Sequence, residues 1–250
     1  MDPCALNGFY SSAQLERYSA AVPKRRSIRA FAGDPDVQQM SALHYAAARL
    51  ALPGVRIALG EGPAGDIYRR LPLVPAIHGT RRYAAIIADE EIPRAAIHAG
   101  ISGEALILEA VSLGLGTCWV AAFKRNGVNV PLEDGEKVKA VIALGKPGEG
   151  GGPRKRKKLT EICASDPADW PLWAYNAAEY VRIAPSAVNL QPWRLSFAGC
   201  TLMLSSVRAN ASLDMGIAAL HMTLGARDKP HTLCWGEGKE ILSLIAEDRI

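Results

Sequence analysis

A glycine- and proline-rich segment divides this chain and limits how it can fold. Residues 146–153 read Lys-Pro-Gly-Glu-Gly-Gly-Gly-Pro, and a basic run over 154–158 follows them. This composition is typical of a linker rather than of a helix or strand. At 250 residues the chain can bury a sizeable core, as one domain or as two small lobes. We therefore expect a first lobe over 1–150, a basic linker over 151–165 and a second, smaller lobe over 166–250.

The same order of elements is predicted on both sides of this linker. Apolar periodicity and turn residues place the elements before it as helix 36–52, strands 55–59 and 83–88, helix 102–113, and strands 118–122 and 138–144. After it they give helix 172–183, strands 193–197 and 201–204, helix 213–225 and strand 232–235. The fragment 101–108 parallels 215–222, and 116–119 parallels 232–235. This pattern favours an internal duplication; two unrelated α+β segments are the alternative.

One apolar stretch, 105–123, is long enough to span a membrane. Gly114 and Gly116 would interrupt a helix there, and the β-favouring sequence from Thr117 to Val120 follows them. Glu109 would also be costly in a bilayer. We expect a buried helix that turns into a strand, and no membrane association.

Composition excludes several classes of function. The formal charge of +4 is mild for this length, and aromatic residues are only 6%, so a nucleic-acid partner is not expected. The five cysteines are scattered without metal-ligand spacing, which favours free thiols in a reducing, cytoplasmic compartment and predicts no metal site. The start of the chain has no signal-peptide pattern. No GxSxG, HExxH, P-loop or GxGxxG motif occurs, and none of the histidines has a catalytic neighbour; His221 is expected in the core.

Near the start, the pentad Arg25-Arg26-Ser27-Ile28-Arg29 concentrates three guanidinium groups and a hydroxyl. A dianionic phosphate is best held by several fixed donors, and arginine offers them in a planar fork. Taken alone, an arginine-rich pentad is more often a solvated surface. A second motif changes this interpretation.

That second motif is the segment 184–193, Ala-Pro-Ser-Ala-Val-Asn-Leu-Gln-Pro-Trp. Pro185 ends the preceding helix near residue 184. The chain then presents backbone groups, the Ser186 hydroxyl and the Asn189 amide, before Trp193 returns to the core. A helix-terminating turn with an Asx-type hydrogen bond is the simpler alternative, but it does not explain the whole string.

The pentad and the segment 184–193 each resemble one half of the FMN-binding signature of the nitroreductase family. In most members the two halves lie close together near the N-terminus, whereas about two-thirds of this chain separates them. The segment 114–123, Gly-Leu-Gly-Thr-Cys-Trp-Val-Ala-Ala-Phe, resembles a third part of the family pattern. Its glycines would equally serve as a helix C-cap. The basic run resembles the closing basic segment of the family, although a solvated linker explains it about as well.

The resemblance implies a cofactor, a reaction and a set of site residues. FMN would be the cofactor, NAD(P)H a transient electron donor, and a small electron-poor molecule the acceptor. The phosphate would be held by the pentad, mainly through Arg25 and Ser27 with Arg26 beside them, and by Arg154 and Arg156; Arg29 would face the N1–C2=O edge; Ala121 and Ala122 would direct a backbone N–H toward N5; and Pro185, Ser186, Ala187, Asn189 and Gln191 would contact the ribityl chain and polar edge. No catalytic side chain is implied.

The divided signature also has an implication for assembly. The chain resembles most closely a subgroup of the family in which the chain is internally duplicated. Its implied fold is α+β, with two related lobes that each have a small mixed or antiparallel sheet and packed helices, forming a pseudo-dimer with one FMN between the lobes. The protein would then be a monomer, or a homodimer that exchanges motifs. The alternatives are a flavin-binding protein with lost or repurposed activity, and a non-flavin interaction module whose basic run binds an anionic partner.

Overall fold

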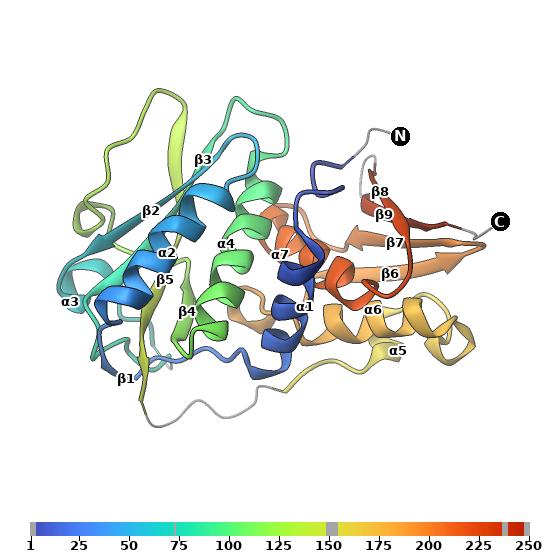
Figure 1. Ribbon diagram of the computed structural model, residues 1–250, viewed down its shortest axis with the longest axis horizontal. Coiled ribbons are helices and arrows are strands. Elements are labelled where there is room, and N and C mark those ends of the chain that lie inside the picture. Colours follow the sequence, from blue (N-terminus) through green and yellow to red (C-terminus); the bar gives the residue numbers. More distant parts are fainter. Residues whose placement is uncertain (1–3, 73, 149–154, 237–239, 248–250) are drawn as a thin grey trace. The chain divides into compact units, whose positions relative to one another are not determined.

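The computed structural model describes residues 4–72, 74–148, 155–236 and 240–247. The chain forms two compact units: unit 1 combines Met1–Val22 with Lys155–Ile250, and unit 2 is Pro23–Arg154. Each unit has its own antiparallel sheet. The expected α+β fold with small antiparallel sheets and packed helices is therefore confirmed (Figure 1).

Unit 2 is built around one sheet with the strand order β2-β3-β5-β4. Its elements are β1 (Phe31–Gly33), α2 (Val37–Arg49), β2 (Val55–Glu61), α3 (Ala64–Ile67), β3 (Arg82–Asp89), α4 (Ala95–Ser112), β4 (Gly116–Val120) and β5 (Glu136–Pro147), with short 3-10 turns at Val22–Lys24 and Arg125–Gly127. All pairs in this order are antiparallel, and β1 pairs with the end of β5. Helix α2 begins at Asp36, whose side chain accepts a hydrogen bond from the Gln39 backbone in a capping box.

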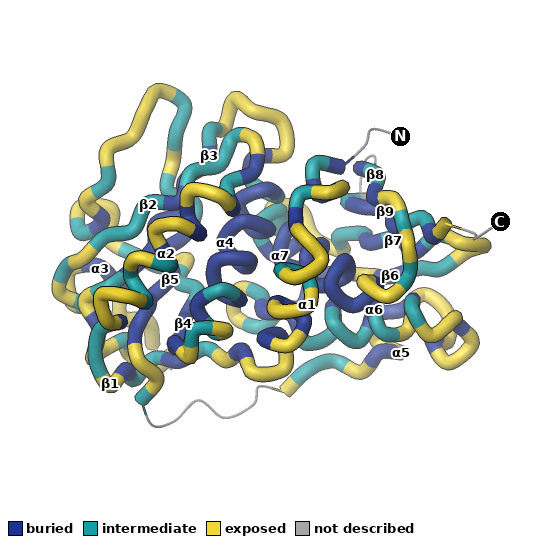
Figure 2. Tube along the Cα trace, viewed as in Figure 1, coloured by how far each residue is buried: buried dark blue, intermediate teal, exposed yellow. Residues whose placement is uncertain are grey.

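Helix α4 is the centre of unit 2. It contacts α2 and the strands β2, β3, β4 and β5, and most of its residues are buried (Figure 2). Among the described residues it is the one helix long and apolar enough to cross a membrane by length and composition, yet 72% of that stretch is buried in the fold. The expected turn from a buried helix into a strand is confirmed, although α4 begins at Ala95, earlier than the predicted residue 102.

The sheet of unit 2 is covered on both faces. On the face away from α4, residues 83, 85 and 87 of β3 join a cluster with Ile28, Phe31, Ile67 and Tyr68. Six consecutive residues of β3 are consequently buried. A strand enclosed on both sides has a continuous apolar run rather than an alternating pattern.

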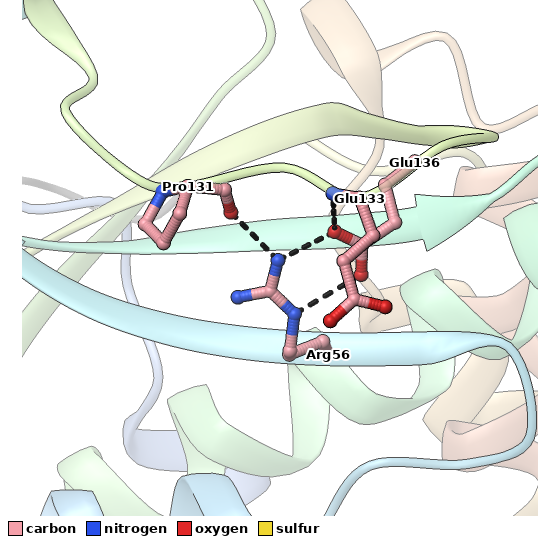
Figure 3. Close-up of polar contacts among 4 residues, drawn as sticks. All are labelled: Arg56, Pro131, Glu133 and Glu136. Atoms are coloured by element: carbon pink, nitrogen blue, oxygen red, sulfur yellow. Dashed lines mark hydrogen bonds and ion pairs between the residues drawn. The ribbon is translucent and has the colours of Figure 1, made fainter.

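A buttress fixes the long connection between β4 and β5. Arg56 of β2 donates from Nε to Glu136 Oε1 at 3.0 Å and from Nη2 to Glu136 Oε2 at 2.5 Å (Figure 3). Arg56 Nη2 also donates to the Pro131 carbonyl at 2.8 Å, and the Glu133 backbone N–H donates to Glu136 at 2.9 Å. One guanidinium therefore ties residues 131–136 to the sheet.

Unit 1 has a sheet of the order β6-β7-β9-β8. Its elements are α1 (Ser12–Ala21), α5 (Leu159–Ile162), α6 (Leu172–Ile183), β6 (Trp193–Ala198), β7 (Thr201–Ser206), α7 (Ser212–Gly225), β8 (His231–Trp235) and β9 (Glu240–Ala246), with 3-10 turns at Pro167–Asp169 and Ala187–Asn189. Helix α7 packs mainly on α6, and also contacts α1 and β9. Trp193 and His221 are buried, as expected, and His221 Nδ1 lies 3.0 Å from the Tyr180 carbonyl oxygen.

The boundaries differ from the expected lobes at the N-terminus. Residues 1–22 belong to unit 1 rather than to a first lobe over 1–150. The reason is local: the Asn7 side chain exchanges two hydrogen bonds with the backbone of Leu233, and Ser19 Oγ donates to the Leu224 carbonyl. Helix α1 and strand β9 were not predicted. The pseudo-dimeric assembly stays a prediction.

Candidate functional site

The pentad is an extended segment alongside β4. Ser27 forms a parallel β-bridge with Thr117, and the Ile28 N–H donates to the Thr117 carbonyl at 2.8 Å. The Arg29 carbonyl accepts from the His78 N–H at 3.0 Å. Gly116 has no room for a side chain, because a Cβ there would lie 3.1 Å from Ile28. The fold thus brings together two fragments that the sequence separates, the pentad and the segment 114–123.

The arginines of the pentad have different environments. The Arg25 side chain is only 7% exposed, and its Nε lies 3.7 Å from Glu104 Oε1. That Nε makes no hydrogen bond within the described structure. Arg26 is exposed, whereas Ser27 and Arg29 are half-buried. A buried guanidinium with an unused donor is unusual, since buried polar groups are nearly always hydrogen-bonded.

Glu104 lies behind Arg25, on α4. It is fully buried, and its Oε2 accepts a hydrogen bond from Trp119 Nε1 at 2.7 Å. The Trp119 ring packs on Gly103, where a Cβ would lie 2.2 Å from the ring. Thr117, two residues before Trp119 and so on the same face of β4, has a buried Oγ1 without a partner among the described residues. A polar cluster is therefore enclosed between α4 and β4, with Arg25 next to it.

Ala121 and Ala122 follow the end of β4. Ala121 is exposed, and the Ala122 carbonyl accepts from the Arg69 N–H at 3.1 Å. An open polar pocket of about 720 Å³ lies near this segment; its lining residues are Glu61, Gly62, Pro63, Asp66, Arg69, Lys124, Arg125, Asn126 and Gly127. Acids and bases share this lining, and none of the predicted site residues belongs to it.

In unit 1, the turn over 185–191 has a strained backbone. Val188, Asn189 and Gln191 all have positive φ, at 43°, 60° and 50°. Such values are rare for residues other than glycine, and most of all for a β-branched one such as valine. The Ser186 Oγ accepts from the Gln191 N–H at 2.8 Å, and this closes the turn. Strain of this kind persists where surrounding contacts over-determine the conformation.

Asp214 of α7 is one of these contacts. Its Oδ1 accepts from the Ala187 N–H at 3.0 Å, and the residue is 6% exposed. Burial raises the pKa of the Asp214 carboxyl, and the hydrogen bond from Ala187 partly offsets this. The first residue of the turn is thus tied to a buried carboxyl.

The basic run lies against the other side of the same turn. Arg156 donates from Nη1 to Asn189 Oδ1 and from Nη2 to the Ile183 carbonyl at 3.2 Å. Asn189 Nδ2 donates to the Lys155 carbonyl at 2.9 Å. Lys157 makes two further bonds, from its N–H to Gln191 Oε1 at 2.9 Å and from Nζ to the Gln191 carbonyl at 3.0 Å. The expected proximity of the basic run to the second motif is therefore present for residues 155–157.

These contacts change the interpretation of two predicted residues. The Asn189 side chain already has a partner at each end, and Arg156 is bound to the turn. A cofactor contact through either group would share or replace a contact inside the protein. Pro185 is buried and Ala187 is exposed beside them. Arg154 lies outside the described residues.

The predicted site residues thus fall into two clusters. Unit 2 holds Arg25, Arg26, Ser27, Arg29, Ala121 and Ala122; unit 1 holds Arg156, Pro185, Ser186, Ala187, Asn189 and Gln191. Sequence reasoning missed Glu104 and Asp214. The available signal was a single acid in an otherwise apolar helix, because such residues are almost never buried unless paired.

The family model described as "Putative TM nitroreductase" matches residues 18–226, most of the chain and both clusters. The chain belongs to this family. The match includes the pentad, the segment 114–123 and the turn over 185–191, so all three fragments that carry the resemblance lie inside it.

Solved structures agree with the fold of this family. A structure described as a putative nitroreductase from Thermotoga maritima has a TM-score of 0.65 and 24% identity, covering 91% of this chain and 93% of its own. One from Parabacteroides distasonis, described as a putative NADH dehydrogenase/NAD(P)H nitroreductase, has a TM-score of 0.46, 19% identity and coverage of 61% and 97%. A nitroreductase with bound FMN from Bacteroides fragilis has a TM-score of 0.42, 16% identity and coverage of 59% and 95%. No curated protein matched the chain.

Proposed function

We propose that this member of the family is an FMN-dependent oxidoreductase of nitroreductase type. NAD(P)H would be its electron donor, and a small electron-poor molecule such as a nitroaromatic or quinone its acceptor. Family membership supports this reaction class. The five cysteines are free thiols, which suits a reducing compartment such as the cytoplasm.

One observation carries the cofactor assignment: the buried, incompletely bonded guanidinium of Arg25. Its side chain is 7% exposed and its Nε has no hydrogen-bond partner within the described structure. Glu104 contributes a negative charge 3.7 Å from Nε, but this distance is too long for a hydrogen bond. A dianionic phosphate would supply the missing acceptors, and Ser27 and Arg29 of the same extended segment would add donors. The residues present therefore fit the phosphate end of FMN.

The second cluster would hold the remainder of the cofactor. The turn over 185–191 presents backbone groups in a conformation fixed by Asp214, Arg156 and Lys157. When bound, FMN would supply the hydride chemistry, so no side chain of this chain has to act as acid or base. The task of the protein would be to bind, orient and exclude water.

The first experiment compares two arginine variants by FMN titration and thermal shift. Arg25→Ala should weaken FMN binding by about 10- to 100-fold, because a charge-assisted bond to phosphate is lost. Arg49→Ala is the matched control, since Arg49 is exposed at the end of α2 and packs over the Tyr45 ring. Purified wild-type protein should be yellow and should bleach with NADH or NADPH under anaerobic conditions.

The same titration separates the alternatives. Yellow protein that does not bleach would indicate a flavin-binding protein without reductase turnover. Colourless protein that gains no thermal stability from added FMN would contradict the proposal and favour an interaction module.

A mixing experiment tests which chains build one site. Arg25→Ala and Asn189→Ala should each weaken FMN binding. If one chain contributes both clusters to its own site, a mixture of the two variants binds no better than each alone. Recovery of high-affinity sites on mixing would show that the clusters are exchanged between two chains, and would contradict one site per monomer.

A further inference from the structure

We propose that Glu104 is a positioning residue, which holds the Arg25 guanidinium for a phosphate group. This inference rests on the proposed function and extends it to a residue outside the motifs. Glu104 is fully buried on α4, and its nearest oxygen lies 3.7 Å from Arg25 Nε. The two residues are far apart in the sequence, and the fold brings them together.

The contact is an ion pair that leaves donors free. At 3.7 Å the charges attract each other strongly in a water-excluded site, but Nε does not donate a hydrogen bond. Arginine has five N–H donors in a fixed fork. Glu104 therefore restrains the guanidinium without occupying the hydrogen Nε carries, and that buried donor has no other partner within the described structure.

Glu104 is itself held in place from the other side. Trp119 Nε1 donates to its Oε2 at 2.7 Å, and the Trp119 ring rests on Gly103 in the same helix. The two carboxylate oxygens thus have separate tasks, one toward β4 and one toward the pentad. A carboxylate fixed in this way can define the direction of Arg25.

The duplicated helix shows that the fold alone does not require this acid. In the parallel between 101–108 and 215–222, the position of Glu104 is taken by Ala218, which is also fully buried. Burying a carboxylate costs free energy that its partner repays only in part, so a buried ion pair is weak evidence for stability. The acid is present in the unit that carries the pentad, which indicates a task connected with Arg25.

The decisive measurement is the ratio of FMN affinity to riboflavin affinity, because riboflavin lacks the phosphate. Glu104→Gln keeps the shape and an acceptor for Trp119 but removes the charge that orients Arg25. We expect FMN affinity to fall about tenfold and riboflavin affinity to change less than twofold. By charge alone the opposite sign is expected, since removal of a negative group near a phosphate site tightens anion binding. Loss of affinity for FMN alone therefore isolates positioning.

Ser102→Ala is the matched control on the same helix. Ser102 is fully buried, and its Oγ accepts from the Leu52 N–H at 3.2 Å, away from Arg25. This variant should leave the FMN-to-riboflavin ratio unchanged. If Glu104→Gln fails to fold, Glu104→Asp keeps the charge but withdraws the carboxylate by one methylene, and the ratio should fall at least threefold.

Two results would overturn the inference. An unchanged or increased ratio in Glu104→Gln, or in Glu104→Asp where the glutamine variant does not fold, would show that Glu104 does not position Arg25 for phosphate. Wild-type protein that binds riboflavin as tightly as FMN would remove the phosphate contact itself and this inference with it. Wild-type protein that binds neither flavin would contradict the proposed function as well, so the failures are distinguishable.

Discussion

Units 1 and 2 repeat one topology around different polar groups. The strand orders β2-β3-β5-β4 and β6-β7-β9-β8 correspond strand by strand, and a long helix stands between the second and third strands of each. Even the register irregularity recurs, between residues 86 and 87 of β3 and between 204 and 205 of β7. Such agreement supports an internal duplication, although sequence identity between the halves is thin.

The two long helices differ in where each carries a buried acid. Helix α4 has Glu104, which faces Arg25, and α7 has Asp214, which accepts from the Ala187 N–H. In the parallel between the helices, Ala218 stands at the position of Glu104 and Gly100 at that of Asp214. Each acid therefore lies in the unit whose motif it contacts. The comparison teaches that divergence of the units extended beyond the motifs to the buried residues that support them.

The largest effects are expected where the two helices are most alike. Leu106 of α4 and Leu220 of α7 occupy corresponding positions, and both are fully buried. Leu106→Ala and Leu220→Ala should each lower the free energy of unfolding by about 2–5 kcal/mol, through lost burial and a residual cavity. Chemical denaturation measures this.

Hydrogen exchange then tests whether the units respond separately. Leu106→Ala should speed exchange in unit 2, and Leu220→Ala in unit 1, because local stability follows local packing. A loss below 1 kcal/mol for one leucine alone would contradict the structural equivalence of the two helices.

The elements common to both units were mostly predictable from sequence, and the supporting contacts were not. Helix α6 was predicted with its observed ends, because its apolar period stops at Pro185. Helix α1 was missed because its composition is polar and its stability comes from a capping box at Ser11 and from packing on α7. The burial of Arg25 depends on Glu104, a contact between distant residues that no local pattern contains.

The acid of α7 predicts a pH dependence that the acid of α4 does not. Burial raises the pKa of Asp214 above its ordinary value of 3.8. As pH rises above 3.8, the unfolded chain releases this proton first, so wild-type stability falls until the folded-state pKa is passed. Each unit of the shift corresponds to about 1.4 kcal/mol. Asp214→Asn keeps an acceptor for Ala187 without this titration.

Denaturation of both proteins at several pH values measures the difference. Relative to wild type, Asp214→Asn should gain stability as pH rises from 4 toward neutrality. A difference that is constant over this range would show that Asp214 titrates alike in the folded and unfolded chains.

The turn of unit 1 has no strained counterpart in the pentad of unit 2, where residues 25–29 have no positive φ. Val188, with φ of 43° and ψ of 26°, is 75% exposed, so its side chain contributes little burial. Val188→Gly should remove strain of about 1–2 kcal/mol at a smaller entropic cost, for a net gain of about 0.5–1 kcal/mol. Val207→Gly is an exposed control on valine loss, and it should be neutral or destabilising. A destabilised Val188→Gly protein would show that the turn is not strained.

The smallest effect concerns the connection that distinguishes the two sheets. In unit 2 residues 121–135 join β4 to β5, whereas in unit 1 residues 236–239 join β8 to β9. The longer connection needs its buttress, and hydrogen bonds from Arg56 lower the pKa of Glu136. A lowered pKa stabilises the fold above the ordinary value near 4.5, and this contribution is lost as pH falls through the folded-state pKa.

Glu136→Gln should therefore cost about 0.5–1 kcal/mol at pH 7, a small value because Arg56 is 37% exposed and solvent screens the pair. The cost should shrink at pH 3 and in high salt. Limited proteolysis should show faster cleavage within residues 121–135, because Glu136 also holds the Glu133 N–H. Glu61→Gln, which removes the more exposed pair with Arg82, is the control and should leave that cleavage unchanged. Equal cleavage in wild type and Glu136→Gln would mean that the connection is ordered by its apolar contacts, such as Val128 in the core cluster, and not by the ion pair.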